Sequence, residues 1–161
     1  MRWVWIDRFT AFESGKSATA VKCLSLAEDY YAEHFPGFPV MPAPLILEGL
    51  AQTGGILVGE ANQFREKVVL AKIPFAKFQR EAHAGEMLTY DVEIIDLRPE
   101  GAVVKCTASC GADVVCDAEI FFAHLDQNRS RQVFGDDNFV FSGELKHLIG
   151  TAKSLPPAPT G

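Results

Sequence analysis

The stretch from residue 34 to residue 52 reads His34-Phe-Pro-Gly-Phe-Pro-Val-Met-Pro-Ala-Pro-Leu-Ile-Leu-Glu48-Gly-Leu-Ala-Gln52. Prolines stiffen its first half, because each one removes a backbone donor and restrains the residue before it. Its second half is an apolar helical pattern with a single acid, Glu48. A rigid, apolar setting is where proteins tune titratable groups for acid–base catalysis. We therefore take His34 and Glu48 as the candidate catalytic pair and expect the rest of the chain to be their scaffold.

The segment 44–63 has the best helical pattern in the chain. Apolar residues recur there with helical spacing, and proline is tolerated in a first turn. Glu48 and Gln52 are four residues apart, so their side chains are neighbours on one side of the helix. Two glycines, Gly54 and Gly55, each cost roughly 1 kcal/mol relative to alanine. This cost indicates that another backbone approaches the helix closely at that point.

Outside this helix the apolar period is mostly two, which is typical of strands. A turn at Ser14-Gly15 joins the first two, and Ser25 with Glu28 predicts a capped short helix at about 26–33. The predicted strands are 3–13, 16–25, 67–73, 75–81, 87–97, 102–110 and 113–124.

One long apolar helix with a long antiparallel meander predicts an α+β fold. The sheet must curve around the helix to bury it, which is the hotdog arrangement. We expect a single hotdog domain over residues 1–125. Residues 126–161 then form a C-terminal extension, with a short helix at 142–149 capped by Ser142 and a disordered, proline-rich tail.

Composition limits the function classes. The chain has 161 residues, of which 48% are hydrophobic, and a net charge of −6, which argues against nucleic acid as a partner. No apolar run reaches the ~20 residues of a membrane span. The first residues do not form a signal peptide, so we expect a cytoplasmic location. Reduced, buried thiols are expected at all four cysteines: Cys23, Cys106, Cys110 and Cys116.

The segment 34–52 resembles the active-site signature of the 3-hydroxyacyl-acyl carrier protein dehydratases of fatty acid synthesis. That signature is H-F-x-G-x-P-V-M-P-G, then an acid fourteen residues after the histidine and a glutamine four residues later. The resemblance continues more loosely to about residue 124, through Ala76-Lys-Phe-Gln-Arg80 and Gly85-Glu-Met-Leu88. Nine positions of the signature match: His34, Phe35, Gly37, Pro39, Val40, Met41, Pro42, Glu48 and Gln52.

The resemblance implies a hotdog homodimer or trimer of dimers, in which His34 of one chain faces Glu48 of the other. His34 is then the base that takes the C2 proton, and Glu48 is the acid that helps hydroxide leave C3 as water, without metal or cofactor. The implied partner is an acyl carrier protein that holds the acyl group on phosphopantetheine. Gln52 holds Glu48 or a water, or is a solvated polar position. The residues assigned to substrate binding are Gly37, Val40, Met41, Ala43 and Gln52.

Two departures from the family pattern stand out. Ala43, followed by Pro44, replaces the glycine whose amide polarises the thioester carbonyl in the family. Pro44 biases Ala43 to extended geometry, so we expect an effect on the rate rather than on the fold. The second departure is Ala84-Gly85-Glu86 in place of P-G-D, in an expected turn.

Two other functions stay open. In a hotdog thioesterase, Glu48 would activate water to attack the thioester carbonyl. In a non-catalytic acyl-binding paralogue, the Ala43-Pro44 step would have removed activity. The pairing of His34 with Glu48 favours the dehydratase, because hydrolysis needs no base for an α-proton.

Basic residues gather in the segment 65–80 of an otherwise acidic chain. This segment is either a docking surface for an acidic carrier protein or a solvated strand edge protected by charges. The remaining histidines, His83, His124 and His147, are expected to be structural or surface residues.

Overall fold

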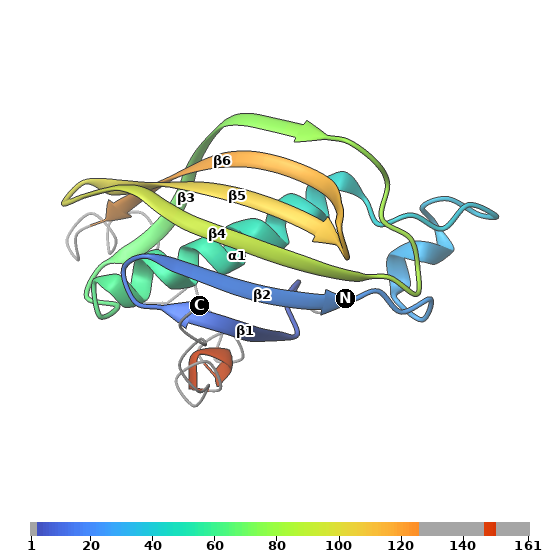
Figure 1. Cartoon of the computed structure of the whole chain (residues 1–161), viewed down its shortest axis with the longest axis horizontal. Helices are drawn as coiled ribbons and strands as arrows, with labels where there is room; N and C mark the ends of the chain where they lie inside the picture. Colours follow the sequence, from blue (N-terminus) through green and yellow to red (C-terminus); the bar gives the residue numbers. More distant parts are fainter. Residues whose placement is uncertain (1–2, 126–146, 151–161) are drawn as a thin grey trace.

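A curved antiparallel sheet arches over one long helix in the computed structural model, which describes residues 3–125 and 147–150 (Figure 1). Within residues 3–125, the helical elements are a 3₁₀ helix η1 at Asp29–Ala32 and the helix α1 at Ala43–Ala61. The strands are β1 Arg8–Glu13, β2 Ser17–Cys23, β3 Lys67–Phe78, β4 Met87–Arg98, β5 Gly101–Cys110 and β6 Asp113–Leu125. The expected hotdog fold is confirmed.

The sheet has the strand order β1-β2-β4-β5-β6-β3, and every neighbouring pair is antiparallel. The strand β3 therefore lies at one edge of the sheet. It joins the two segments predicted at 67–73 and 75–81 into one strand, with register shifts between Leu70 and Phe75. Pro74 lies within this irregular part of an edge strand, where a missing backbone donor is tolerated.

Helix α1 is buried on most of its surface because the sheet wraps it. Its twelve buried residues include Gln52 and Thr53 as well as the apolar ones. A Cβ added to Gly49 would overlap the ring of Tyr90 on β4, and one added to Gly54 would meet the side chains of Phe122 and Val104 at 3.1 and 3.2 Å. The predicted close approach is confirmed at Gly54, where side chains rather than a neighbouring backbone make it, and Gly49 shows a second one.

Two local predictions before α1 were wrong. The expected helix at 26–33 is only the four-residue η1, and the Ser25 hydroxyl accepts from the Ala27 N–H at 3.2 Å in a local turn instead of capping a helix. The first strand begins at Arg8 rather than at residue 3, because the Trp5 N–H is donated to the side chain of Gln52 and not to a neighbouring strand.

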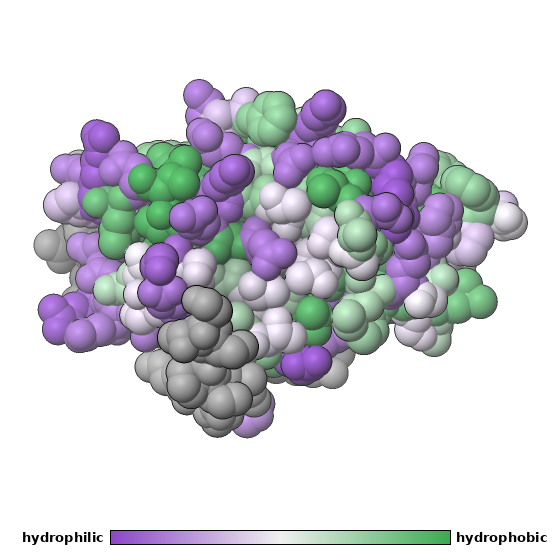
Figure 2. Space-filling model, in the orientation of Figure 1, coloured by the Kyte–Doolittle hydropathy of each residue, from purple (hydrophilic) through white to green (hydrophobic). Residues whose placement is uncertain are grey.

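The face in Figure 2 is largely hydrophilic with separate hydrophobic patches. Exposed large apolar side chains include Ile95 on β4 and, on β3, Leu70, Phe75 and Phe78.

Residues 147–150 are helical, with Ile149 buried in the core, whereas Ser142 and the tail lie outside the described residues. In the described part of the chain, no helix is both long and apolar enough to cross a membrane.

The cysteines are free thiols, but their burial differs from the prediction. Cys106, Cys110 and Cys116 are buried, whereas Cys23 is exposed at the end of β2. Burial raises the pKa of the Cys116 thiol to about 11, so this thiol stays protonated at neutral pH.

Candidate active site

Glu48 lies one turn into α1, and its carboxylate is held by two donors. The Gln52 amide donates from Nε2 to Glu48 Oε1 at 3.0 Å, and the indole of Trp3 donates from Nε1 to the same oxygen at 3.1 Å. The contact with Gln52 follows the expected i, i+4 geometry. The contact with Trp3 spans 45 residues of sequence, and no periodicity in the chain signals it.

Gln52 is buried, with a relative exposure of 7%, so the alternative of a solvated polar position is wrong. Its Oε1 accepts the Trp5 N–H at 2.8 Å, and its Nε2 also donates to the Trp3 carbonyl at 3.1 Å. Because the Trp5 N–H fixes which end of the amide is oxygen, the network defines one orientation of Gln52. Gln52 thereby ties the N-terminal segment to the helix beside Glu48.

His34 begins the proline-rich loop. Its N–H donates to the Tyr30 carbonyl at 2.9 Å, its carbonyl accepts from the Val40 N–H at 3.3 Å, and its ring stacks on Phe35 with centroids 4.2 Å apart. Phe35 and Phe38 are each 54% exposed, whereas Val40 is buried. Within one chain, the loop therefore leaves two phenylalanine side chains exposed.

The turn 80–86 supports the end of this loop. The Met41 N–H donates to the Ala82 carbonyl at 2.8 Å, and Val40 forms an isolated β-bridge with His83. Glu86 accepts from Arg80 at 2.6 Å and from the His83 N–H at 2.7 Å. The hydrogen bond from Arg80 holds the pKa of the Glu86 carboxyl below its ordinary value. The turn expected at Ala84-Gly85-Glu86 is present, with Gly85 at φ +92°.

The start of α1 leaves few amides free. Pro42 caps the helix, and its carbonyl accepts the N–H groups of Leu45 at 2.9 Å and Ile46 at 3.4 Å. The first N–H groups of a helix have no intrahelical partner, and Pro44 has no N–H at all. The Ala43 N–H is therefore the amide that the first two helical positions offer to a ligand, at the positive end of the helix dipole.

The predicted substrate-binding residues occupy different environments. Gly37 is exposed at the tip of the loop with φ +82°, and Ala43 is exposed at the helix start. Met41 belongs to the hydrophobic core of its own chain. Within the described residues of this single chain, no hydrogen bond or ion pair joins His34 to Glu48.

Some basic residues of the segment 65–80 already contact other side chains of the same chain. Arg80 pairs with Glu86, and the Arg65 guanidinium donates to the Gln63 carboxamide at 2.8 Å. Lys72 and Lys77 are exposed on the edge strand β3.

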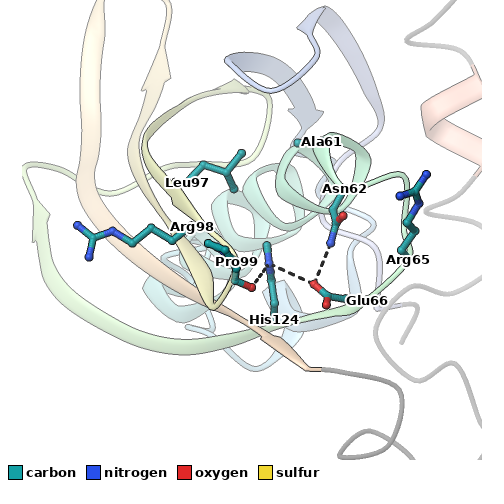
Figure 3. A pocket seen from close by; sticks show the side chains of 8 residues that line it. All are labelled: Ala61, Asn62, Arg65, Glu66, Leu97, Arg98, Pro99 and His124. Atoms are coloured by element: carbon teal, nitrogen blue, oxygen red, sulfur yellow. Dashed lines mark hydrogen bonds and ion pairs between the residues drawn. The ribbon is translucent and has the colours of Figure 1, made fainter.

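His124 lines a hollow beside the C-terminal end of α1, away from Glu48 (Figure 3). Its side chain is 5% exposed, and its Nδ1 lies 3.1 Å from the Pro99 carbonyl and 3.5 Å from Glu66 Oε2. Glu66 also accepts from Asn62 at 2.9 Å. These contacts join the end of α1 to the β4–β5 turn, which confirms a structural role for His124. The hollow has a volume of about 410 Å³, and none of the candidate site residues lines it.

Among residues 3–125 and 147–150, no group of three or more His, Cys, Asp or Glu side chains could hold a metal ion. The candidate residues themselves offer an imidazole, a carboxyl group and backbone amides. The expectation of a reaction without metal or cofactor stays a prediction.

The structure defines the chain as a hotdog-fold protein with a histidine in a loop and an acid on the central helix. Comparisons with known sequences show its family. The chain belongs to the FabA-like domain family, whose match covers residues 2–123. It is 39% identical over 120 residues to a 3-hydroxyacyl-acyl carrier protein dehydratase FabZ from Levilactobacillus brevis, covering 74% of this chain and 81% of that protein. It is also 39% identical to the FabZ protein of Listeria welshimeri, over 75% of this chain and 85% of the relative.

Solved structures with little sequence identity share the fold. The dehydratase heterocomplex ApeI:P from Xenorhabdus doucetiae aligns with a TM-score of 0.66 and 13% identity, covering 83% of this chain and 91% of that one. A hypothetical thioesterase with coenzyme A from Streptococcus pneumoniae aligns with a TM-score of 0.60 and 10% identity, covering 74% and 86%. At such identities the likeness supports the hotdog fold alone.

Proposed function

We propose that this chain is a 3-hydroxyacyl-acyl carrier protein dehydratase of fatty acid biosynthesis, a hydro-lyase that forms trans-2-enoyl thioesters. The observation that carries the proposal is the placement of His34, Glu48 and Gln52 at the family's spacing, in a chain 39% identical to a FabZ relative. The hydrogen bond from Gln52 to Glu48, at 3.0 Å, supports the assigned roles of both residues.

The reaction needs a base, an acid and an electrostatic stabiliser. His34 takes the proton from C2, and negative charge develops on the thioester carbonyl oxygen. The Ala43 N–H, at the positive end of α1, stabilises that charge. Glu48 gives its proton to the leaving hydroxyl, and the C3–O bond breaks to release water.

The site is completed by a second copy of the chain. Two features support a homodimer: the apolar loop around Phe35 and Phe38 is exposed, and β3 is a long strand at the edge of the sheet that residues 3–125 form. In the dimer, His34 of one chain works with Glu48 of the other. Gly37, Val40 and Met41 carry or support the loop that lines the acyl site, with Ala43 and Gln52 on the helix side. Assembly into a trimer of dimers stays a prediction.

The substrate arrives on the phosphopantetheine of an acyl carrier protein. The basic segment 65–80, rather than any single residue in it, supplies the positive charge that attracts an acidic carrier. The cytoplasmic location and the domain boundary at residue 125 also stay predictions; cell fractionation tests the first, and truncation at Leu125 tests the second.

The test is an assay with 3-hydroxyacyl- and enoyl-acyl carrier protein as substrates, following hydration state and free thiol together. We expect conversion between the two thioesters without thiol release, and losses of about 10²-fold or more in His34→Ala and Glu48→Gln. Free thiol without enoyl product would identify a thioesterase. Carrier binding without turnover of either kind would identify an acyl-binding protein.

A further inference from the structure

The two donors on Glu48 contact the same oxygen. Trp3 Nε1 and Gln52 Nε2 lie 3.1 and 3.0 Å from Oε1. Both atoms carry hydrogens and can only donate, because an indole N–H and an amide NH₂ have no acceptor role. Oε1 therefore accepts two hydrogen bonds, whereas no hydrogen bond is found at Oε2 among the described residues.

This asymmetry decides where a proton can reside on Glu48. A protonated carboxyl group carries its hydrogen on one oxygen, and the other oxygen keeps its lone pairs. A hydrogen on Oε1 would point at the two N–H groups and break at least one of the bonds. The reacting proton consequently resides on Oε2.

We propose that Trp3 is a positioning residue for the acid, acting together with Gln52 to hold Oε1 as the acceptor and to present Oε2 to the leaving hydroxyl. The inference rests on the proposed function, because it gives a role to Trp3 only if Glu48 is the acid. The proton balance is complete: His34 gains the C2 proton, the O–H bond of Glu48 breaks at Oε2, and that proton leaves with the C3 hydroxyl as water.

Trp3 is anchored for this role although the residue is 60% exposed. Its carbonyl accepts from Gln52 Nε2 at 3.1 Å, and its ring meets Trp5 edge-on, with centroids 5.8 Å apart. Trp5 is buried and donates its N–H to Gln52 Oε1. The two hydrogens of the Gln52 amide thus bond to the Trp3 carbonyl and to Glu48, so one side chain fixes both the indole and the acid.

The two tryptophans of the chain allow a clean test. The Nε1 of Trp5 is buried without a hydrogen-bond partner among the described residues, so replacing both indoles by benzothiophene removes only the bond from Trp3. A tryptophan auxotroph fed 3-benzothienylalanine supplies this protein. Its shape is retained, so the variant remains informative if Trp3→Phe or Trp3→Ala folds poorly.

We expect kcat to fall about tenfold with the benzothienyl protein and with Trp3→Phe, while KM changes less than about twofold. Trp3→His restores an N–H on a smaller ring and should recover part of the loss. If Trp3 only supported the fold, its replacement would lower the melting temperature without lowering kcat more than it changes KM.

Glu48→Gln, measured beside these variants, separates the two claims. Wild-type kcat in the benzothienyl protein, with Glu48→Gln inactive, overturns the role of Trp3 and leaves the proposed function intact. Wild-type turnover in Glu48→Gln overturns both, because Glu48 would not be the acid. A loss in the benzothienyl protein with partial recovery in Trp3→His supports the inference.

Discussion

At Gly49, the absence of a side chain lets α1 pack directly against the ring of Tyr90. Both residues are buried, and Gly49 directly follows the candidate acid Glu48. Packing at this one position therefore sets how deeply the helix lies in the sheet, and with it the position of the carboxyl group.

We expect Gly49→Ala to destabilise the protein by about 3 kcal/mol, because the new methyl group overlaps the ring and an overpacked core must shift its backbone. Urea unfolding of both proteins measures the difference. Gly54→Ala is the matched control, since its methyl group meets side chains at 3.1 Å or more and helix propensity favours alanine. A Gly49→Ala protein as stable as Gly54→Ala would contradict this account of the packing.

Local sequence patterns identify some of these residues and miss others. The signature from His34 to Gln52 and the four-residue step from Glu48 to Gln52 involve residues that are near each other in the sequence, so a local pattern reveals them. Tyr90 against Gly49 and Trp3 against Glu48 are contacts between residues 41 and 45 positions apart. No local pattern encodes such pairs, so the sequence pointed to Gly54-Gly55 and missed both Gly49 and Trp3.

At the level of elements, the turn 80–86 holds the end of the proline-rich loop through Ala82 and His83. Glu86 organises that turn, since its carboxylate accepts from Arg80 and from the His83 N–H. The loop that carries His34 thus depends on a second loop, which the sequence marked only as a turn.

Glu86→Gln should lower the free energy of unfolding by about 1 kcal/mol at pH 7, because the charged partner of Arg80 is lost. The pKa of Glu86 is lowered by Arg80 in the folded protein, so this stabilisation is complete above the ordinary pKa of about 4.3. It is lost as the pH falls through the lowered folded pKa.

Urea unfolding at pH 7, 5 and 3 tests this pH dependence. The difference in free energy of unfolding between wild type and Glu86→Gln should be largest at pH 7 and should narrow towards pH 3. A gap that widens on acidification would show that the carboxylate is not stabilised by Arg80.

Element boundaries depended on tertiary partners. The α1 prediction was close because its apolar period continues over about five turns, and β4, β5 and β6 alternate clearly. The segment 3–7 has strand-forming residues, yet Trp5 donates to Gln52 instead. The two short segments around Pro74 form one edge strand, since an edge tolerates the missing donor that would break a central strand.

At the scale of the whole molecule, β3 is the element expected to join two copies. It is a twelve-residue edge strand with Leu70, Phe75 and Phe78 exposed. Phe75→Lys should weaken the dimer about 30-fold or more, since a central aromatic at an interface is typically worth about 2 kcal/mol. Sedimentation across a concentration series measures the effect, and dehydration should fall with the dimer fraction.

Ile95→Lys is the matched control, because Ile95 is 52% exposed, close to the 50% of Phe75, but lies on β4 away from that edge. It should leave the dimer intact. Equal weakening by both variants would place the interface elsewhere, and full activity in a Phe75→Lys monomer would show that one chain forms a complete site.

Subunit complementation tests the central claim most directly. His34→Ala and Glu48→Gln are each expected to be inactive, but a mixed dimer has one site with an intact His34 from one chain and an intact Glu48 from the other. After subunit exchange at equal concentrations, random pairing gives mixed dimers in about half of the population, and about a quarter of wild-type dehydration should return. Native mass spectrometry confirms the exchange. Mixed dimers without recovered activity would contradict a site shared between two chains.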